Sequence, residues 1–149
     1  MTANINPIFG RTSDLQLAGA IIGTSANTAT DGTGANISAI YQADATEGSY
    51  VYTVRLKSVA STAATVARLW YHSTTGAFTP GTTNTAANTT MIAEVTLAAF
   101  TASNTLASPT YEIPVNIAMP PGTRLLMSFG TTTGAATTGF NPLIIAMKY

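Results

Sequence analysis

The amino-acid sequence predicts an all-β fold, an antiparallel β-sandwich of about eight strands with a jelly-roll-like arrangement. Apolar and polar residues alternate with period two in several stretches, which is typical of strands that bury one face. Gly- and Pro-containing turns separate these stretches, and none of them combines a helical period with capping residues. Thr, Val and Ile, which favour strands, occur throughout.

The chain of 149 residues has the size of a single domain. We expect residues 1–14 to form an N-terminal arm, because they are apolar but show no periodicity, and residues 15–149 to form the sandwich. The arm either docks on its own domain or reaches a neighbouring molecule. Its apolar residues are Ile5, Pro7, Ile8 and Phe9.

Residues 48–73 dominate the prediction. They contain two stretches with strand character, 49–59 and 64–73, which we expect to pair as a hairpin at the centre of a sheet. In the first stretch Val54 and Leu56 are expected inside the sandwich, and the second stretch carries Trp70. Arg68 lies two residues before Trp70 and therefore on the same face of the strand. It either stacks on the Trp70 indole or extends its charged end to solvent.

The remaining strands follow the same alternation. Leu15 and Leu17 are expected to face the core, and Ile40 and Tyr41 are the main hydrophobic residues of the next strand. Pro114 predicts that its strand lies at a sheet edge because proline lacks an N–H donor. Three further inward sets are Met91, Ala93, Val95 and Leu97; Tyr111, Ile113, Val115 and Ile117; and Leu125, Met127 and Phe129. The expected strands span residues 15–22, 36–43, 49–59, 64–73, 91–99, 110–118, 123–129 and 143–149.

Charged residues are unusually rare. They make up 8% of the chain, whereas an ordinary soluble domain has about 25%. Six Lys and Arg balance six Asp and Glu, so the chain lacks the basic surface that nucleic-acid binding requires. A surface of Thr, Ser, Asn, Ala and Gly suits a component of a larger assembly, although a neutral secreted domain would share this composition.

The sequence shows no targeting signal. Its first basic residue is Arg11, and the apolar run at residues 18–23 is too short to span a membrane. We therefore expect synthesis in the cytoplasm and no membrane partner. The chain has no cysteine, which excludes disulfides and thiolate metal sites.

No catalytic, metal or cofactor site emerges from the sequence. The single histidine, His72, has no neighbouring partner in a known motif, and we expect it to be structural. Asp31, Asp44 and Glu47 are interpreted as turn residues, with an oxygen-rich calcium loop as the alternative. The long loop at residues 74–90 has few residues to bury apart from Phe78, and such loops are often functional.

Three segments carry a resemblance to a known family. They are Asp-Gly-Thr-Gly at residues 31–34, the stretch at residues 48–69, and Met-Pro-Pro-Gly-Thr-Arg-Leu-Leu at residues 119–126. Together they resemble small all-β structural proteins of tailed bacteriophages that act as capsid cement or decoration proteins. The resemblance covers most of the chain, although the loop at residues 74–90 does not match.

This resemblance implies a non-enzymatic virion protein that binds the outer surface of the capsid and stabilises it as a homotrimer. Its partners would be the major capsid protein and other copies of itself. We expect the contacts to come from the arm, through Ile5, Pro7, Ile8 and Phe9, and from the long loop, through Phe78 and Pro80. Two alternatives remain open: a tail, tail-tip or head-fibre module that binds a host receptor, and a carbohydrate-binding β-sandwich domain.

Overall fold

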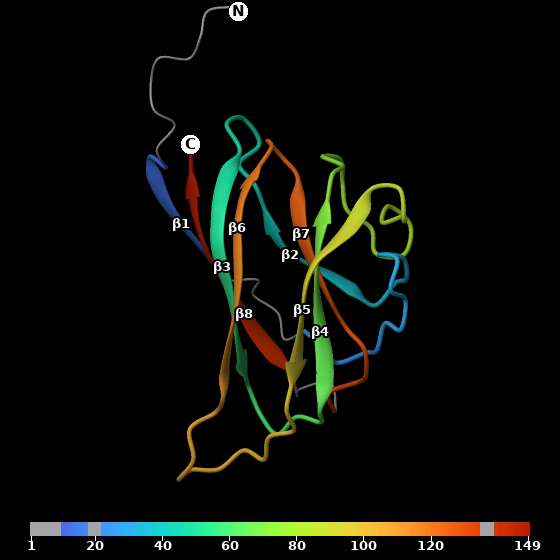
Figure 1. The fold of residues 1–149 in the computed structure, drawn as a ribbon, viewed down its shortest axis with the longest axis vertical. Helices are drawn as coiled ribbons and strands as arrows, with labels where there is room; N and C mark the ends of the chain where they lie inside the picture. Colours follow the sequence, from blue (N-terminus) through green and yellow to red (C-terminus); the bar gives the residue numbers. More distant parts are fainter. Residues whose placement is uncertain (1–9, 18–21, 135–138) are drawn as a thin grey trace, which may run out of the picture.

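The structure, a computed structural model, describes residues 10–17, 22–134 and 139–149. Within them, two four-stranded antiparallel sheets pack face to face, and there is no helix (Figure 1). The first sheet has the order β1 (Thr12–Leu17), β8 (Phe140–Lys148), β3 (Ser49–Ser58), β6 (Thr110–Met119). The second has the order β2 (Ile37–Gln42), β7 (Arg124–Phe129), β4 (Thr65–His72), β5 (Thr89–Leu97). The predicted antiparallel β-sandwich is confirmed.

The strands pair as the two arms of one long hairpin would. β1 pairs with β8, β2 with β7, β3 with β6 and β4 with β5, all antiparallel. Folding this hairpin over itself adds the pairs β3–β8 and β4–β7, which complete the two sheets. The jelly-roll description of these connections stays a prediction.

The predicted central hairpin is wrong. Both of its strands form, as β3 and β4, but they lie in different sheets and each is an inner strand of its own sheet. The residues between them do not close a tight turn, because their backbone groups bond elsewhere. The N–H of Val59 donates to Gly139 O, and Thr62 exchanges two backbone hydrogen bonds with Phe100.

The core lies between the two sheets. Phe129 of β7 and Phe140 of β8 stack across it, with ring centroids 5.6 Å apart and planes inclined by 5°. Tyr111 of β6 contacts Phe140 edge-on at 6.4 Å. The inner faces of β3 and β7 follow the predicted alternation, with Val54, Leu56, Leu125, Met127 and Phe129 buried.

A second apolar cluster lies outside the second sheet. Trp70, Ile37 and Leu126 form it, with Phe78 and Met91 partly buried against them. The Trp70 indole N–H donates to Ser128 Oγ at 2.9 Å. Because this outer face is covered as well as the inner one, every residue of β7 is buried.

Two long loops lie together beside this second sheet (Figure 1). Asn84 joins the loop before β5 to the loop before β2. Its buried side-chain amide donates to Gly32 O at 2.8 Å and Gly34 O at 3.0 Å, and its carbonyl accepts from Gly81 N at 2.7 Å. The loop at residues 74–90 is thus an ordered part of the fold.

Bulges explain where the alternation changes phase. In β2 the register shifts between Ala39 and Tyr41, so that the adjacent residues Ile40 and Tyr41 are both buried. The pairing of β4 with β5 shifts in the same way and places Met91 opposite Trp70. Met91 therefore packs in the Trp70 cluster, and its predicted position beside Ala93 in the main core is wrong.

β1 has the opposite phase to the prediction. Leu15 and Leu17 are 64% and 74% exposed, whereas Asp14 is buried. The reason lies in the neighbouring sheet, where the Tyr41 hydroxyl donates to Asp14 Oδ2 at 2.9 Å. Gln16 supports the same carboxylate through its amide, so the polar residues of β1 point toward the rim of the core and the leucines point out.

The termini of several strands differ from the prediction, but the edge assignment is correct. Pro114 lies in β6, an edge strand, and is exposed. β8 begins at Phe140 and contains Pro142, which pairs with Leu56 of β3. On the other side of β8, the pairing with β1 ends at Leu143. Pro142 lies beyond this last pair, so its missing N–H removes no hydrogen bond to β1. β1 begins at Thr12, and the division into arm and domain stays a prediction.

We expect Asn84→Ala to destabilise the fold by about 2–3 kcal/mol, because it leaves two carbonyls and one N–H in a buried loop junction without their partner. Urea unfolding measures the change. Thr82→Ala, at an exposed position of the same loop, is the control and should change stability by less than about 0.5 kcal/mol. Equal stability of the two variants would contradict the pinning role of Asn84.

Candidate interaction surface

His72 is a buried structural residue. Its ring is fully buried at the end of β4, where Nδ1 lies 3.0 Å from Thr89 Oγ1 and Nε2 contacts Thr74 Oγ1. Phe78 meets the ring edge-on at 5.4 Å. Burial lowers the pKa of His72 below its usual value, and the positive charge of Arg124 lowers it further. The imidazole is therefore neutral at pH 7 and both of its nitrogens are in use.

Asp31 and Asp44 accept hydrogen bonds within the turns in which they lie. Asp31 Oδ1 accepts hydrogen bonds from Thr33 N and Oγ1, and Asp44 Oδ1 accepts from Thr46 N and Glu47 N. These bonds lower the pKa of both carboxyl groups. Among the residues described, no group of three or more His, Asp or Glu side chains could hold a metal ion. The structure therefore supports the turn interpretation of Asp31 and Asp44.

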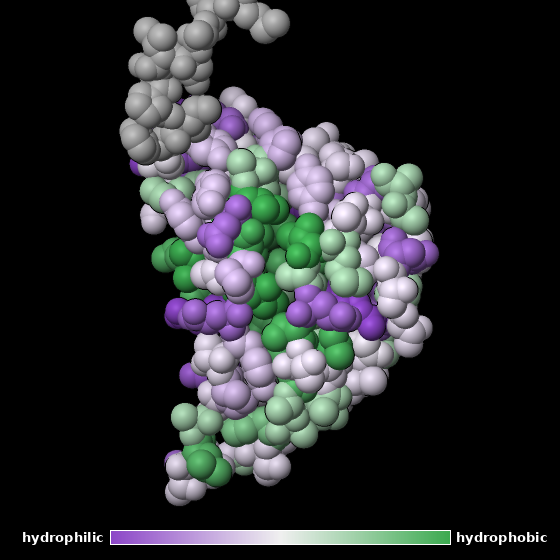
Figure 2. Space-filling model, in the orientation of Figure 1, coloured by the Kyte–Doolittle hydropathy of each residue, from purple (hydrophilic) through white to green (hydrophobic). Residues whose placement is uncertain are grey.

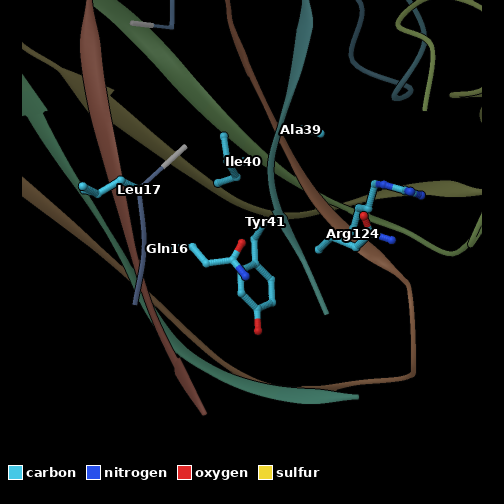
Figure 3. Close-up of a pocket in the computed structure, with 7 residues that line it drawn as sticks. Gln16, Leu17, Ala39, Ile40, Tyr41 and Arg124 are labelled. Atoms are coloured by element: carbon cyan, nitrogen blue, oxygen red, sulfur yellow. The ribbon is translucent and has the colours of Figure 1, made fainter. Parts of the chain in front are cut away.

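A hollow of about 250 Å³ opens between β1, β2 and the start of β7 (Figure 3). Gln16 and Leu17 of β1, Ile40 and Tyr41 of β2 and Arg124 of β7 lie around it. Burial, and then the neighbouring Asp14, raises the pKa of the Tyr41 phenol, so that Tyr41 stays a hydroxyl donor to Asp14. This hollow thus lies beside a structural hydrogen bond that joins the two sheets.

The few charged side chains neutralise one another. Arg68 Nε lies 2.9 Å from Glu94 and Arg55 pairs with Glu112, in each case across two neighbouring strands. Four ion pairs use eight of the twelve charged side chains: Arg11–Glu47, Arg55–Glu112, Arg68–Glu94 and Lys148–Asp44. Of the other four, Asp14 and Arg124 are buried, so Lys57 and Asp31 are the exposed charged side chains outside these ion pairs.

The contact residues predicted from the sequence are only partly described. Ile5, Pro7, Ile8 and Phe9 lie outside the described residues. Phe78 is half-buried and packs against the Trp70 cluster, so part of its side chain serves the fold. Pro80 is exposed at the tip of the same loop. The role of these residues as contacts stays a prediction.

Sequence analysis missed an apolar area on the outer face of the first sheet. Leu15 is directly opposite Ile145 and Leu17 is directly opposite Leu143. Next to them, the Tyr52 hydroxyl contacts Met147 Sδ at 3.0 Å. We call this area the β1–β8 patch; it comprises Leu15, Leu17, Tyr52, Leu143, Ile145 and Met147. The alternation in β1 was visible in the sequence, but only the Tyr41–Asp14 hydrogen bond decides which face is outside.

A second apolar area lies where the two sheets open between β5 and β6. Figure 2 shows it as a strip with hydrophilic side chains on both sides. We call it the β5–β6 strip. Its residues are partly buried against the core: Ala93, Val95, Tyr111, Val115 and Ile117.

Comparison of the chain with family models, with curated proteins and with solved structures finds no match. The described residues also contain no helix that is long and apolar enough to cross a membrane.

We expect the protein to lose stability when the pH falls from about 7 to 5, because burial holds the pKa of folded His72 below the 6.5 of the unfolded residue. The unfolded state then holds more protons, and the free energy of unfolding should fall by up to about 1.4 kcal/mol per pH unit. The lowered carboxyl pKa values of Asp31 and Asp44 act only at more acidic pH.

Urea unfolding at several pH values measures this slope, with His72→Gln as the comparison. The variant should be less stable at pH 7 but should show a flatter dependence between pH 7 and 5. An equal slope in both proteins would contradict the assignment to His72.

Proposed function

We propose that this chain is a non-enzymatic virion structural protein, a cement protein that binds the outer surface of a tailed-phage capsid as a homotrimer. The observation that carries the proposal is the combination of surface charges that are mostly paired with an exposed apolar patch on one sheet. Exposed apolar patches are typical of protein–protein interaction sites. The resemblance found in the sequence adds the phage shell as the partner.

The mechanism is mechanical. Each bound copy adds contact area that must separate before the shell can expand or rupture under internal pressure. A stable protein contact buries about 1,600 Å² in total, and copies linked to one another hold the lattice together even if each single contact is weak. The two-sheet sandwich suits this role because its inner strands are hydrogen-bonded on both sides, and we interpret its strand order as that of a jelly roll.

The carbohydrate-binding alternative fits the structure less well than the cement protein. A carbohydrate-binding sandwich requires aromatic rings exposed on a flat face, but Trp70 is buried and bonded to Ser128. Tyr50 and Tyr52 form an edge-on pair at 4.8 Å rather than a flat platform. A tail or fibre module that binds a receptor would have the same fold and is distinguished by its few copies per particle.

The proposal is tested by co-sedimentation of the protein with shells of the major capsid protein encoded alongside it. The full chain should saturate the shells with many copies. Deletion of residues 2–10, which removes Ile5, Pro7, Ile8 and Phe9, should reduce occupancy at least about tenfold, as expected when the central residues of an interface are lost.

Circular dichroism and thermal unfolding of the truncated protein provide the control for folding. Pro80→Ala tests the loop contact in the same assay. If the truncated protein decorates the shells at full occupancy, the arm is not a contact. If the full chain does not bind the shells at all, the proposed function is wrong.

A further inference from the structure

Two unlike apolar surfaces lie at opposite edges of the first sheet. The β1–β8 patch covers the outer face at one edge, and the β5–β6 strip adjoins the other edge at β6. Among residues 10–17, 22–134 and 139–149, nothing packs over either surface, because the patch points away from the core and the strip remains partly open (Figure 2).

The two surfaces differ in exposure. In the patch, Leu15 and Leu17 project from an edge strand with 64% and 74% of their surface exposed. In the strip, Val95 and Val115 are partly buried and packed against the core. A projecting pair of leucines packs more closely on partly buried apolar side chains than on a second projecting pair, because close packing requires complementary surfaces.

The charges around both surfaces are also compatible with self-contact. The ion pair Arg55–Glu112 lies on the β3–β6 side of the strip, and Arg68–Glu94 lies on the β4–β5 side. The first of these pairs is on the same sheet as the patch, where Arg55 is directly opposite Leu143. Since both of these ion pairs are neutral within one copy, they do not repel a second copy, and a strongly charged partner would find little complementary charge beside the two surfaces.

We propose that the β1–β8 patch of one copy packs into the β5–β6 strip of a second copy. The contact is head-to-tail, because it joins two different surfaces. Head-to-tail contacts form rings when the rotation closes and filaments when it does not. The closed form covers both apolar surfaces in every copy. This inference rests on the self-association in the proposed function and names the surfaces that would carry it.

The experiment uses the isolated full chain without shells, so that its outcome is independent of capsid binding. Sedimentation velocity should show a species larger than a dimer at micromolar concentration. Leu15→Thr/Leu17→Thr removes the patch, and Val95→Thr/Val115→Thr changes the strip with little change in volume. Each double variant should raise the apparent dissociation constant at least about tenfold while circular dichroism reports an unchanged fold.

Leu106→Thr is the matched control, since Leu106 is 68% exposed but lies in the loop before β6, outside both surfaces. It should associate like the unmodified chain. A monomeric unmodified chain would overturn the proposal, as would a patch variant that assembles normally. The first result would fit a patch covered by the same chain's residues 1–9.

Mixing the two double variants gives the decisive test. The strip variant retains its patch and the patch variant retains its strip, so one contact can form between them. The mixture should therefore contain one-to-one dimers and nothing larger, although each variant alone is monomeric. If the mixture stays monomeric, the contact is not between patch and strip, and the proposal is wrong. If the strip variant is unfolded, Val115→Thr alone is mixed with the patch variant and judged in the same way.

Discussion

Packing between the two sheets is the main constraint on this fold, and the stacked rings of Phe129 and Phe140 join the sheets within the core, at the end of β7 and the start of β8. Each belongs to an inner strand, so their contact fixes the separation of β7 and β8 and of the strands beside them. The chain has no disulfide and few charges, so this packing and the backbone hydrogen bonds must provide most of the stability. The hydrogen bond from Tyr41 to Asp14 joins the sheets again at the rim.

The sequence was sufficient for the fold class and for most inward positions. Alternation in β3, β6 and β7 identified Val54, Ile113 and Leu125 as inward residues, and Pro114 identified an edge. It could not identify strand partners, because period two tells which side chains share a face and not which strands are adjacent. The expected hairpin of β3 and β4 failed for this reason. Bulges, such as the one that moves Met91 to the outer cluster, depend on pairing as well.

The candidate surface was less predictable than the fold. In β1, Leu15 and Leu17 alternate with Asp14 and Gln16, and local preference favours leucine inside. The partner that reverses this choice, Tyr41, is far away in the sequence and in the other sheet. The scarcity of charge was evident from composition, but its pairing into four neutral contacts depends on strand register. The first feature places an apolar patch on the outer face of the first sheet, and the second leaves most charged side chains on the surface in neutral pairs.

A sandwich with a net charge of zero and an apolar patch on one outer face fits the proposed role as one component of a larger assembly. The most direct measurement is a reconstruction of the particle assembled by the genome that encodes this chain. The account predicts density for the sandwich at many equivalent positions on the outer surface of the shell, with neighbouring copies in contact. Density confined to the tail, or a particle that lacks the protein altogether, would contradict it.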